Sequence, residues 1–173
     1  MEVFDVIIVG GGPAGLICAK TLAKSEKRVL LLEKDAVFGD KLCARGLTSK
    51  NIVLLEVTDN IIDQKICNAT LLSPRNRSIT HTPTPLLFTV DRKNLGKWQR
   101  DSLEGSGVNI RTNAKVVGID QKTISLQDGT RYGYAHLVGA DGYSSMVRRY
   151  LELPVTKKLI GMQYTLPVTE KAP

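Results

Sequence analysis

Apolar and polar positions in the first 33 residues predict a strand, a helix and a second strand. Residues 3–9 form an apolar, β-branched run that ends in glycines. Across residues 13–24, apolar side chains recur with the spacing of an amphipathic helix. Residues 29–32 are continuously hydrophobic, which is typical of a parallel strand covered on both faces. The chain therefore opens with a βαβ unit.

The middle of the chain is expected to hold a small second sheet between two helices. Thr48 or Ser49 is placed to cap a short helix. Residues 66–72 and 85–90 are expected to be strands, separated by a turn-rich segment. A longer helix is expected over residues 91–103, before the glycines of EGSGV.

The last third of the chain is expected to consist mainly of short strands. Asp128-Gly129 matches a two-residue hairpin turn. Residues 159–168 are also strand-like. The other expected strands are residues 108–111, 115–119, 123–126, 132–134 and 136–139.

The composition fits one globular core. The chain has 173 residues, of which 42% are hydrophobic and 24% charged, as in ordinary soluble domains. Lys and Arg number 24 against 17 acidic residues, so the net charge is 24 − 17 = +7, which suits an anionic ligand or a membrane surface. No nucleic-acid partner is expected, because aromatic residues make up only 5% and no recognition motif is present.

Neither a metal site nor secretion is expected. Cys18, Cys43 and Cys67 form no C-x-x-C pair, and reduced cysteines are typical of a cytosolic protein. The apolar start of the chain contains Glu2 and Asp5 and reaches glycines too early for a signal peptide or a membrane span. We therefore expect a cytoplasmic protein, with peripheral membrane contact left open.

The sequence DVIIVGGGPAG carries the strongest chemical signal. Gly10, Gly12 and Gly15 occupy the G-x-G-x-x-G positions between a strand and a helix. The first glycine makes the tight turn, the second lets the backbone approach a pyrophosphate, and the third lets helix and strand pack closely. The helix start offers unpaired N–H groups to phosphates. Glu33 ends the second strand, where a carboxylate can accept hydrogen bonds from ribose hydroxyls, so an adenine dinucleotide, either NAD or FAD, is predicted.

A second motif, Asp141-Gly142-x-x-Ser145-x-Val147-Arg148, lies near the carboxyl end. Preceded in order by GGGPAG, CARGL and DRKNL, it resembles the FAD-dependent oxidoreductases of the geranylgeranyl reductase family, in the wider group that includes the aromatic hydroxylases. The resemblance covers nearly the whole chain. It implies that Asp141 and Gly142 lie beside the FAD pyrophosphate and that Arg148 braces the turn or meets a phosphate. A solvated turn before a basic helix is the alternative.

The resemblance also implies the fold class and the domains. The fold is expected to be α/β, a Rossmann-like FAD-binding domain with a βαβ start and a β-meander, plus part of a substrate-domain β-sheet. Residues 1–65 and 88–151 are assigned to the FAD-binding domain. Residues 66–87 and 152–173 are assigned to the substrate sheet, which is cut partway because family members continue well beyond this length.

In the family, a loop of the form C-G-x-G-L lies close to the isoalloxazine of FAD. Cys43, Ala44 and Gly46 match that loop by position. The chain departs from it at Ala44, where glycine is common, and at Arg45, where glycine or an acid is common. Cys43 and Arg45 are therefore candidates for catalysis near the flavin, and the alternative for Cys43 is a small buried hydrophobe.

Two further positions are carried over from the family. Arg92 resembles an arginine that reaches the flavin, although the acid often found four residues later is replaced by Gly96, and a plain helix-surface arginine is the alternative. Val116 matches a position whose backbone meets adenine, or it is a core valine. The candidate cofactor-binding residues are Gly10, Gly12, Pro13, Ala14, Gly15, Glu33, Lys34, Cys43, Ala44, Gly46, Arg92, Val116, Asp141 and Gly142.

The implied reaction is reduction of the C=C bonds of a geranylgeranyl or other polyprenyl lipid. Reduced flavin gives a hydride to one alkene carbon and an unidentified acid protonates the other, with NAD(P)H or another donor supplying electrons. One alternative is a hydroxylase-type FAD monooxygenase. Another is a non-catalytic FAD-binding module, or half of a split enzyme that needs a complementing chain.

Overall fold

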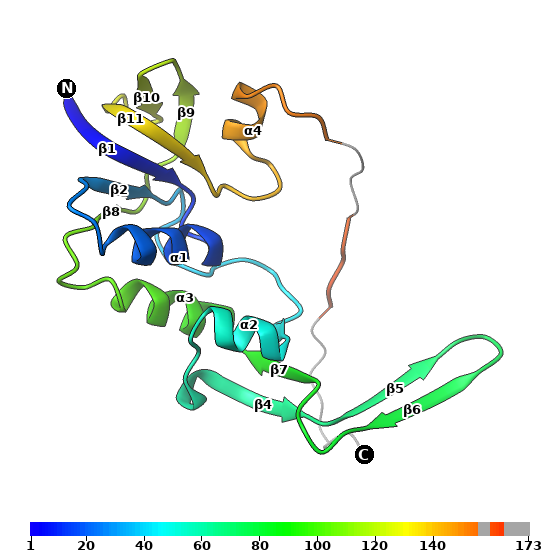
Figure 1. The fold of residues 1–173 in the computed structure, drawn as a ribbon. Coiled ribbons are helices and arrows are strands. Elements are labelled where there is room, and N and C mark those ends of the chain that lie inside the picture. The colour runs from blue at the N-terminus through cyan, green and yellow to red at the C-terminus, as the bar shows by residue number, and fades with distance from the viewer. Residues whose placement is uncertain (156–159, 165–173) are drawn as a thin grey trace.

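The main body is a six-stranded sheet of mixed direction, with strand order β8-β2-β1-β11-β10-β9 (Figure 1). The computed structural model describes residues 1–155 and 160–164. Strands β8, β2, β1 and β11 run parallel to one another, whereas β10 and β9 continue from β11 as an antiparallel meander. The strands are β1 (Glu2–Val9), β2 (Val29–Leu32), β8 (Asn109–Arg111), β9 (Val116–Ile119), β10 (Thr123–Leu126) and β11 (Arg131–Gly139).

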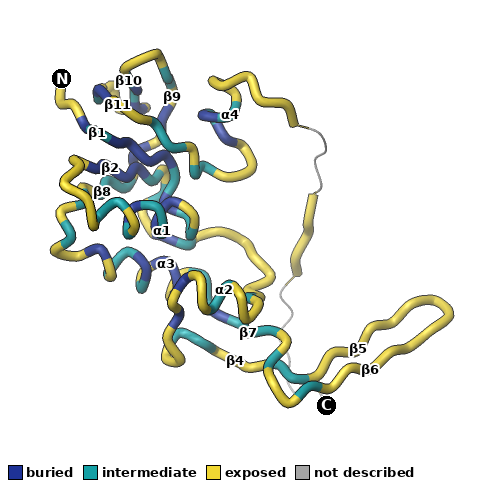
Figure 2. Tube along the Cα trace, in the orientation of Figure 1, coloured by how far each residue is buried: buried dark blue, intermediate teal, exposed yellow. Residues whose placement is uncertain are grey.

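Both faces of the central strands are buried. Alternate residues of β1 divide between two cores, Val6 and Ile8 in one and Ile7 and Val9 in the other. The first core lies against α1 (Pro13–Leu22), and the second lies against the β9–β10 meander and the short helix α4 (Met146–Tyr150). All four residues of β2 are buried, which explains its unbroken hydrophobic sequence (Figure 2). The α/β class and the opening βαβ unit are therefore confirmed.

A smaller lobe packs under α3 (Arg92–Asp101). It contains α2 (Ser49–Leu54), a single 3-10 turn (Asp59–Ile61) and a three-stranded sheet of β3 (Gly46–Leu47), β7 (Leu87–Val90) and β4 (Ile62–Ile66). Leu55, Val57, Val90 and Leu95 form its core. The expected cap of α2 is confirmed, because Thr48 and Asn51 make a reciprocal capping box.

A two-stranded ribbon, β5 (Asn68–Leu72) and β6 (Arg77–His81), extends from this lobe (Figure 1). All residues of both strands are exposed, including Leu71, Leu72 and Ile79 (Figure 2). The ribbon makes no sheet with the rest of the described chain. An exposed ribbon of this kind leaves its edges open for pairing with other strands.

Several of the predicted strands need correction. The single strand expected at residues 66–72 is two strands, because β4 pairs with β7 while β5 pairs with β6. The turn-rich segment contains an unexpected strand, β6. The two strands expected at residues 132–134 and 136–139 are one strand, β11, since it pairs with β1 along its length. Of the strand expected at residues 159–168, residues 160–164 have no regular structure and the remainder lies outside the described residues.

Candidate cofactor site

The glycine loop joins the carboxyl end of β1 to α1, and two of its glycines are required by close backbone contacts. Gly10 has φ +106°, and a Cβ there would lie 2.4 Å from the carbonyl oxygen of Ala140. A Cβ on Gly15 would lie 1.9 Å from the carbonyl oxygen of Gly10. Both distances are far below van der Waals contact, so only glycine fits. Gly10 thus holds the loop against the end of β11, and Gly15 lets α1 pack on it.

The third glycine of the motif faces open space. A Cβ on Gly12 would meet no atom within 4 Å, and Gly12 is the N-cap of α1 without a side-chain cap. Pro13 and Ala14 form the first turn, which contains no acidic residue. Pro13 has no N–H, so the backbone N–H groups of Ala14 and Gly15 are the ones available to an anion at the positive end of the helix dipole.

Glu33 lies against the glycine loop. Its Oε2 accepts a hydrogen bond from the backbone N–H of Gly11 at 2.6 Å, and its Oε1 accepts one from Asp35 N–H at 2.9 Å. The carboxylate therefore holds the glycine loop to the end of β2. The neighbouring Lys34 is exposed and its Nζ lies 3.4 Å from an Asp35 carboxylate oxygen.

The second motif caps α4 and lies beside the glycine loop. Oδ2 of Asp141 accepts hydrogen bonds from the N–H groups of Met146 and Val147, at 2.6 and 3.2 Å. Its Oδ1 is buried without a hydrogen-bond partner among the described residues. Ser145 Oγ accepts from Arg148 N–H at 2.9 Å. The acid and the serine of the motif thus satisfy the first N–H groups of the helix.

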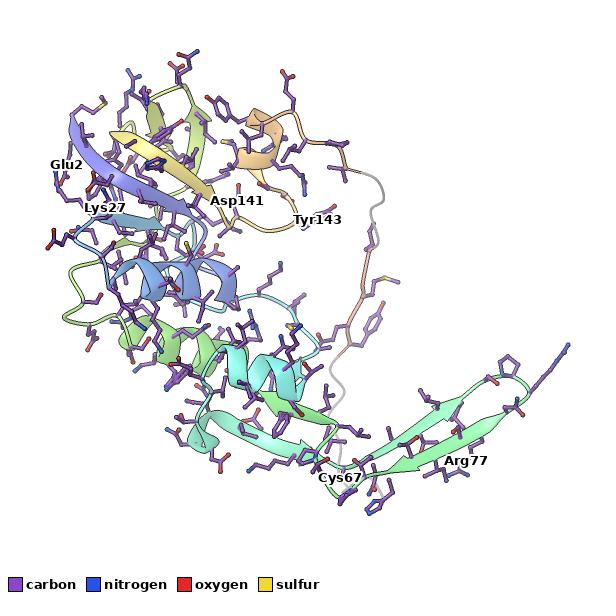
Figure 3. All side chains as sticks on the ribbon, viewed as in Figure 1. Glu2, Lys27, Cys67, Arg77, Asp141 and Tyr143 are labelled. Atoms are coloured by element: carbon purple, nitrogen blue, oxygen red, sulfur yellow. The ribbon has the colours of Figure 1, made fainter. Side chains whose placement is uncertain are left out.

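Arg148 braces this turn, which is the first of its two expected roles. Its Nη2 donates to the carbonyl oxygen of Tyr143 at 2.6 Å. Figure 3 shows Asp141 and Tyr143 on the loop between β11 and α4. Because Ala140 N–H donates to the Val9 carbonyl at 2.8 Å, this loop is held at the carboxyl end of β1. The fold therefore brings the two motifs together.

Residues 39–45 form a strap that is attached at both ends to the start of α3. At one end a Cβ on Gly39 would lie 2.0 Å from the Arg92 carbonyl oxygen, and Asp40 pairs with Lys93 at 3.1 Å. At the other end Arg45 Nη2 lies 3.4 Å from Asp91 Oδ2. The strap between these attachments is exposed.

The strap contains the candidate flavin loop. Cys43 and Ala44 are both exposed, so the buried-hydrophobe interpretation of Cys43 is wrong. Arg45 has φ +64°, a conformation in which glycine is far less strained than arginine. Gly46 begins β3 and pairs with Thr89 of β7.

Asp91 connects the strap to the helix. Its Oδ1 accepts from the N–H groups of Asn94 and Lys93, at 3.1 and 2.9 Å. These hydrogen bonds, that from Asn94 foremost, together with the charges of Arg45 and Lys93, lower the pKa of the Asp91 carboxyl. Asp91 therefore caps α3 as a carboxylate, although the predicted helix of residues 91–103 included it as the first helical residue.

Arg92 is the first residue of α3 and is half-buried. Its Nε is buried without a hydrogen-bond partner in the described part of the chain, which distinguishes it from a plain surface arginine. Gly96 stands where the family often has an acid. At this position α3 passes too close to the backbone of residues 38 and 39 for a larger side chain. A Cβ on Gly96 would lie 2.7 Å from the carbonyl carbon of Phe38. Val116 is buried in the second core, so its side chain is a core side chain and only its backbone is left for adenine.

A groove of about 650 Å³ lies between residues 36–38, α3 and residues 103–112. Phe38 lines it and also lies against Gly11. Its basic side chains are paired, Lys93 with Asp40, Lys97 with Asp101 and Arg100 with Glu104. The groove is therefore distinct from the glycine loop and presents little unpaired charge.

Two classes of feature are not found in the described residues. No group of three or more His, Cys, Asp or Glu side chains is arranged to hold a metal ion. No helix of residues 1–155 and 160–164 is both long and apolar enough to cross a bilayer.

The sequence model of the family described as "FAD binding domain" matches residues 3–172. The chain belongs to this family. The cofactor is therefore FAD, and the site fits it. The uncapped start of α1 and the open space at Gly12 leave room for a pyrophosphate, and the Glu33 carboxylate lies next to this loop.

Curated relatives confirm the resemblance to geranylgeranyl reductases. The chain is 33% identical to digeranylgeranylglycerophospholipid reductase 3 of Methanosphaera stadtmanae, over 94% of this chain and 46% of that protein. It is 28% identical to the geranylgeranyl diphosphate reductase of Rhodobacter capsulatus, over 89% of this chain and 41% of that protein. The chain thus spans less than half the length of these relatives.

Solved structures share the fold. A geranylgeranyl bacteriochlorophyll reductase-like protein from Thermoplasma acidophilum aligns with a TM-score of 0.69 at 20% identity, covering 83% of this chain and 40% of that one. A probable FAD-dependent monooxygenase from Pseudomonas aeruginosa aligns with a TM-score of 0.72 at 17% identity, covering 92% and 48%. At these identities the likeness concerns the fold alone.

Proposed function

We propose that the protein is an FAD-dependent oxidoreductase of the geranylgeranyl reductase type, which reduces C=C bonds of a polyprenyl lipid. The observation that carries the proposal is the similarity to named reductases, at 28 to 33% identity over about nine tenths of the chain. When bound, FAD supplies the hydride. The protein's own residues bind and orient the cofactor.

In this proposal each part of the site has a separate task. The first turn of α1 and the backbone at Gly12 bind the pyrophosphate, and Glu33 receives the ribose hydroxyls while keeping the glycine loop in place. Asp141 and Gly142 lie on the far side of the pyrophosphate. Cys43 and Ala44 approach the flavin from the strap, and Gly46 approaches it from the start of β3. Arg92, with its unpartnered Nε, reaches the flavin from α3.

The remaining candidates have supporting tasks. Lys34 and the backbone of Val116 contribute to the adenosine end of the site. Arg45 shapes the strap, and its charge lies towards the substrate end. Residues 1–65 and 88–151 are assigned to the FAD-binding domain, and residues 66–87 and 152–173 are assigned to the substrate domain. The β5–β6 ribbon supports this division, because its apolar side chains Leu71, Leu72 and Ile79 are exposed and do not pack against the FAD-binding domain. NAD(P)H or another donor reduces the flavin, and the cytoplasmic protein meets its lipid by peripheral membrane contact.

The direct test is anaerobic turnover. The chain is loaded with FAD, reduced with dithionite and mixed with a geranylgeranyl lipid in detergent. Mass spectrometry of the extracted lipid is expected to show the addition of H₂ across double bonds. Lipid left unchanged while FAD is bound and reduced contradicts the proposal for this chain and favours a non-catalytic FAD-binding module.

A second candidate is a hydroxylase-type monooxygenase, a class that shares this fold, as the Pseudomonas aeruginosa protein does. The two enzymes differ in their use of oxygen. A monooxygenase incorporates an oxygen atom from isotopically labelled O₂ into its product, whereas a C=C reductase gives the same product with and without air. The split-enzyme alternative is tested by adding the carboxy-terminal half of a full-length relative, which would restore turnover that the chain alone lacks.

A further inference from the structure

Lys41 is placed beside the second motif by the strap. A Cβ on Gly142 would lie 4.0 Å from Lys41 Nζ, and apart from Gly142 and its chain neighbours no other atom of the described residues lies within that distance of it. Gly142 follows Asp141, whose loop contacts the glycine loop at Gly10. The ammonium group of Lys41 is therefore at the rim of the space in which the two motifs meet. No motif in the sequence marks this lysine.

Four neighbouring cations are already engaged, whereas Arg92, whose Nε has no partner in the described part of the chain, is half-buried at the start of α3. Lys34 pairs with Asp35, Lys93 with Asp40 and Arg45 with Asp91. Arg148 donates its guanidinium to the Tyr143 carbonyl. Lys41, in contrast, is exposed and forms no ion pair within 4.0 Å among residues 1–155 and 160–164.

The negative charge around the glycine loop favours a cation such as Lys41. Glu33 and Asp141 place two carboxylates around the glycine loop. A pyrophosphate bound there adds further negative charge, which the partial positive charge of one helix start offsets only in part. A lysine ammonium is a compact charge with three donors that suits phosphate oxygens.

We propose that Lys41 binds the pyrophosphate of FAD and that the strap serves to place it there. The two attachments of the strap to α3 limit where the lysine can go, so less entropy is lost on binding than for a lysine on a free loop. The inference rests on FAD binding and does not depend on which substrate the flavin reduces.

The test is the dissociation constant for FAD, measured by quenching of flavin fluorescence. Lys41→Met keeps the length of the side chain and removes its charge, and it is expected to weaken FAD binding about tenfold. Lys41→Arg is expected to stay within about threefold of the wild type, because charge and donors remain. Lys50→Met, which removes an exposed cation from α2, is the matched control for net charge and is expected to have no effect.

The salt dependence of FAD binding and the affinities for ADP and riboflavin show whether Lys41 contacts the pyrophosphate. The difference between wild type and Lys41→Met is expected to shrink as salt rises from about 0.05 to 0.5 M, since screening weakens an exposed contact. ADP, which displaces FAD by competition, is expected to lose affinity for Lys41→Met by a similar factor. Riboflavin, which has no phosphate, is expected to bind both proteins equally.

Three results overturn the inference: equal FAD affinity for Lys41→Met and Lys50→Met, a loss confined to riboflavin, or a wild-type chain that binds no FAD. Because Lys41 is exposed, its variants are expected to keep the wild-type circular dichroism spectrum and melting temperature. A chain that binds FAD through Lys41 but reduces no lipid refutes the proposed activity alone and leaves this inference intact.

Discussion

Arg45 is held in a left-handed backbone conformation, with φ +64°, by its place in the strap. Its carbonyl accepts from Val90 N–H at 3.0 Å and its guanidinium pairs with Asp91. In this conformation the Cβ of an L-residue lies too close to the following carbonyl oxygen, and glycine, which has no Cβ, avoids this clash. The ion pair is exposed and offsets little of that cost.

Replacing Arg45 therefore separates backbone strain from charge. Arg45→Gly and Arg45→Ala both lose the ion pair, but only glycine relieves the strain. The glycine variant is expected to have a free energy of unfolding about 1 kcal/mol greater than the alanine variant, measured by urea denaturation. An alanine variant as stable as the glycine variant would show that the left-handed conformation costs nothing here.

Asp91 gives a pH-dependent contribution to stability. Its pKa is lowered in the folded protein by hydrogen bonds from Asn94 and Lys93 and by the charge of Arg45. The contribution is therefore present above the ordinary Asp pKa of about 3.9 and is lost as pH falls through the lowered folded-state pKa. Asp91→Ala is expected to cost about 1 kcal/mol at pH 7 through loss of the α3 cap.

Asp91→Asn is the matched control, because asparagine caps a helix without a charge. Wild type is expected to be the more stable of the two at pH 7, and the difference is expected to disappear in acid. The measurement is urea denaturation of both proteins across the acid range. A difference that stays constant as the pH falls would refute the role of the charge.

At the scale of elements, substitutions at two glycines of the turn between β1 and α1 are expected to distinguish an effect on folding from an effect on FAD binding. Gly15→Ala places a methyl group against the Gly10 carbonyl, whereas Gly12→Ala places one in open space. Gly15→Ala is expected to lower both stability and FAD affinity. Gly12→Ala, at φ −72°, is expected to keep the wild-type unfolding curve while weakening FAD binding at least tenfold. Equal effects of the two variants on the unfolding curve would contradict this assignment.

The elements also show how far sequence alone could go. Continuous hydrophobic runs and the glycine motif were enough to predict β1, α1 and β2, because these features depend on local sequence. β11 was predicted as two strands separated at Ala135, because its pairing with β1 is a long-range contact that sequence does not show. β6 was missed because SPRNRS has the composition of a turn.

The strap shows the same limit within the site. The family resemblance indicated residues 43–46, but the attachments that place them come from close contacts at Gly39 and Gly96. Neither glycine belongs to a motif, and the pattern of hydrophobic and polar residues along the sequence does not indicate such contacts. Lys41 was overlooked for the same reason, since its position depends on the strap's path past Gly142.

At the scale of the whole molecule, a complete sheet core carries the cofactor site, and an open lobe extends away from it (Figure 1). The core buries every residue of β2, whereas the β5–β6 ribbon buries none of its residues. The chain spans less than half the length of its curated relatives. The cofactor site is therefore the part of the account that this chain can test by itself.

The most direct measurement is the visible absorbance of the chain after incubation with FAD and removal of free cofactor. The account predicts an equimolar flavin spectrum for the wild type and loss of that spectrum in Gly12→Ala, which keeps the fold. A wild-type chain that folds but remains colourless would contradict the claim that the glycine loop, Glu33 and the Asp141 motif together form an FAD site.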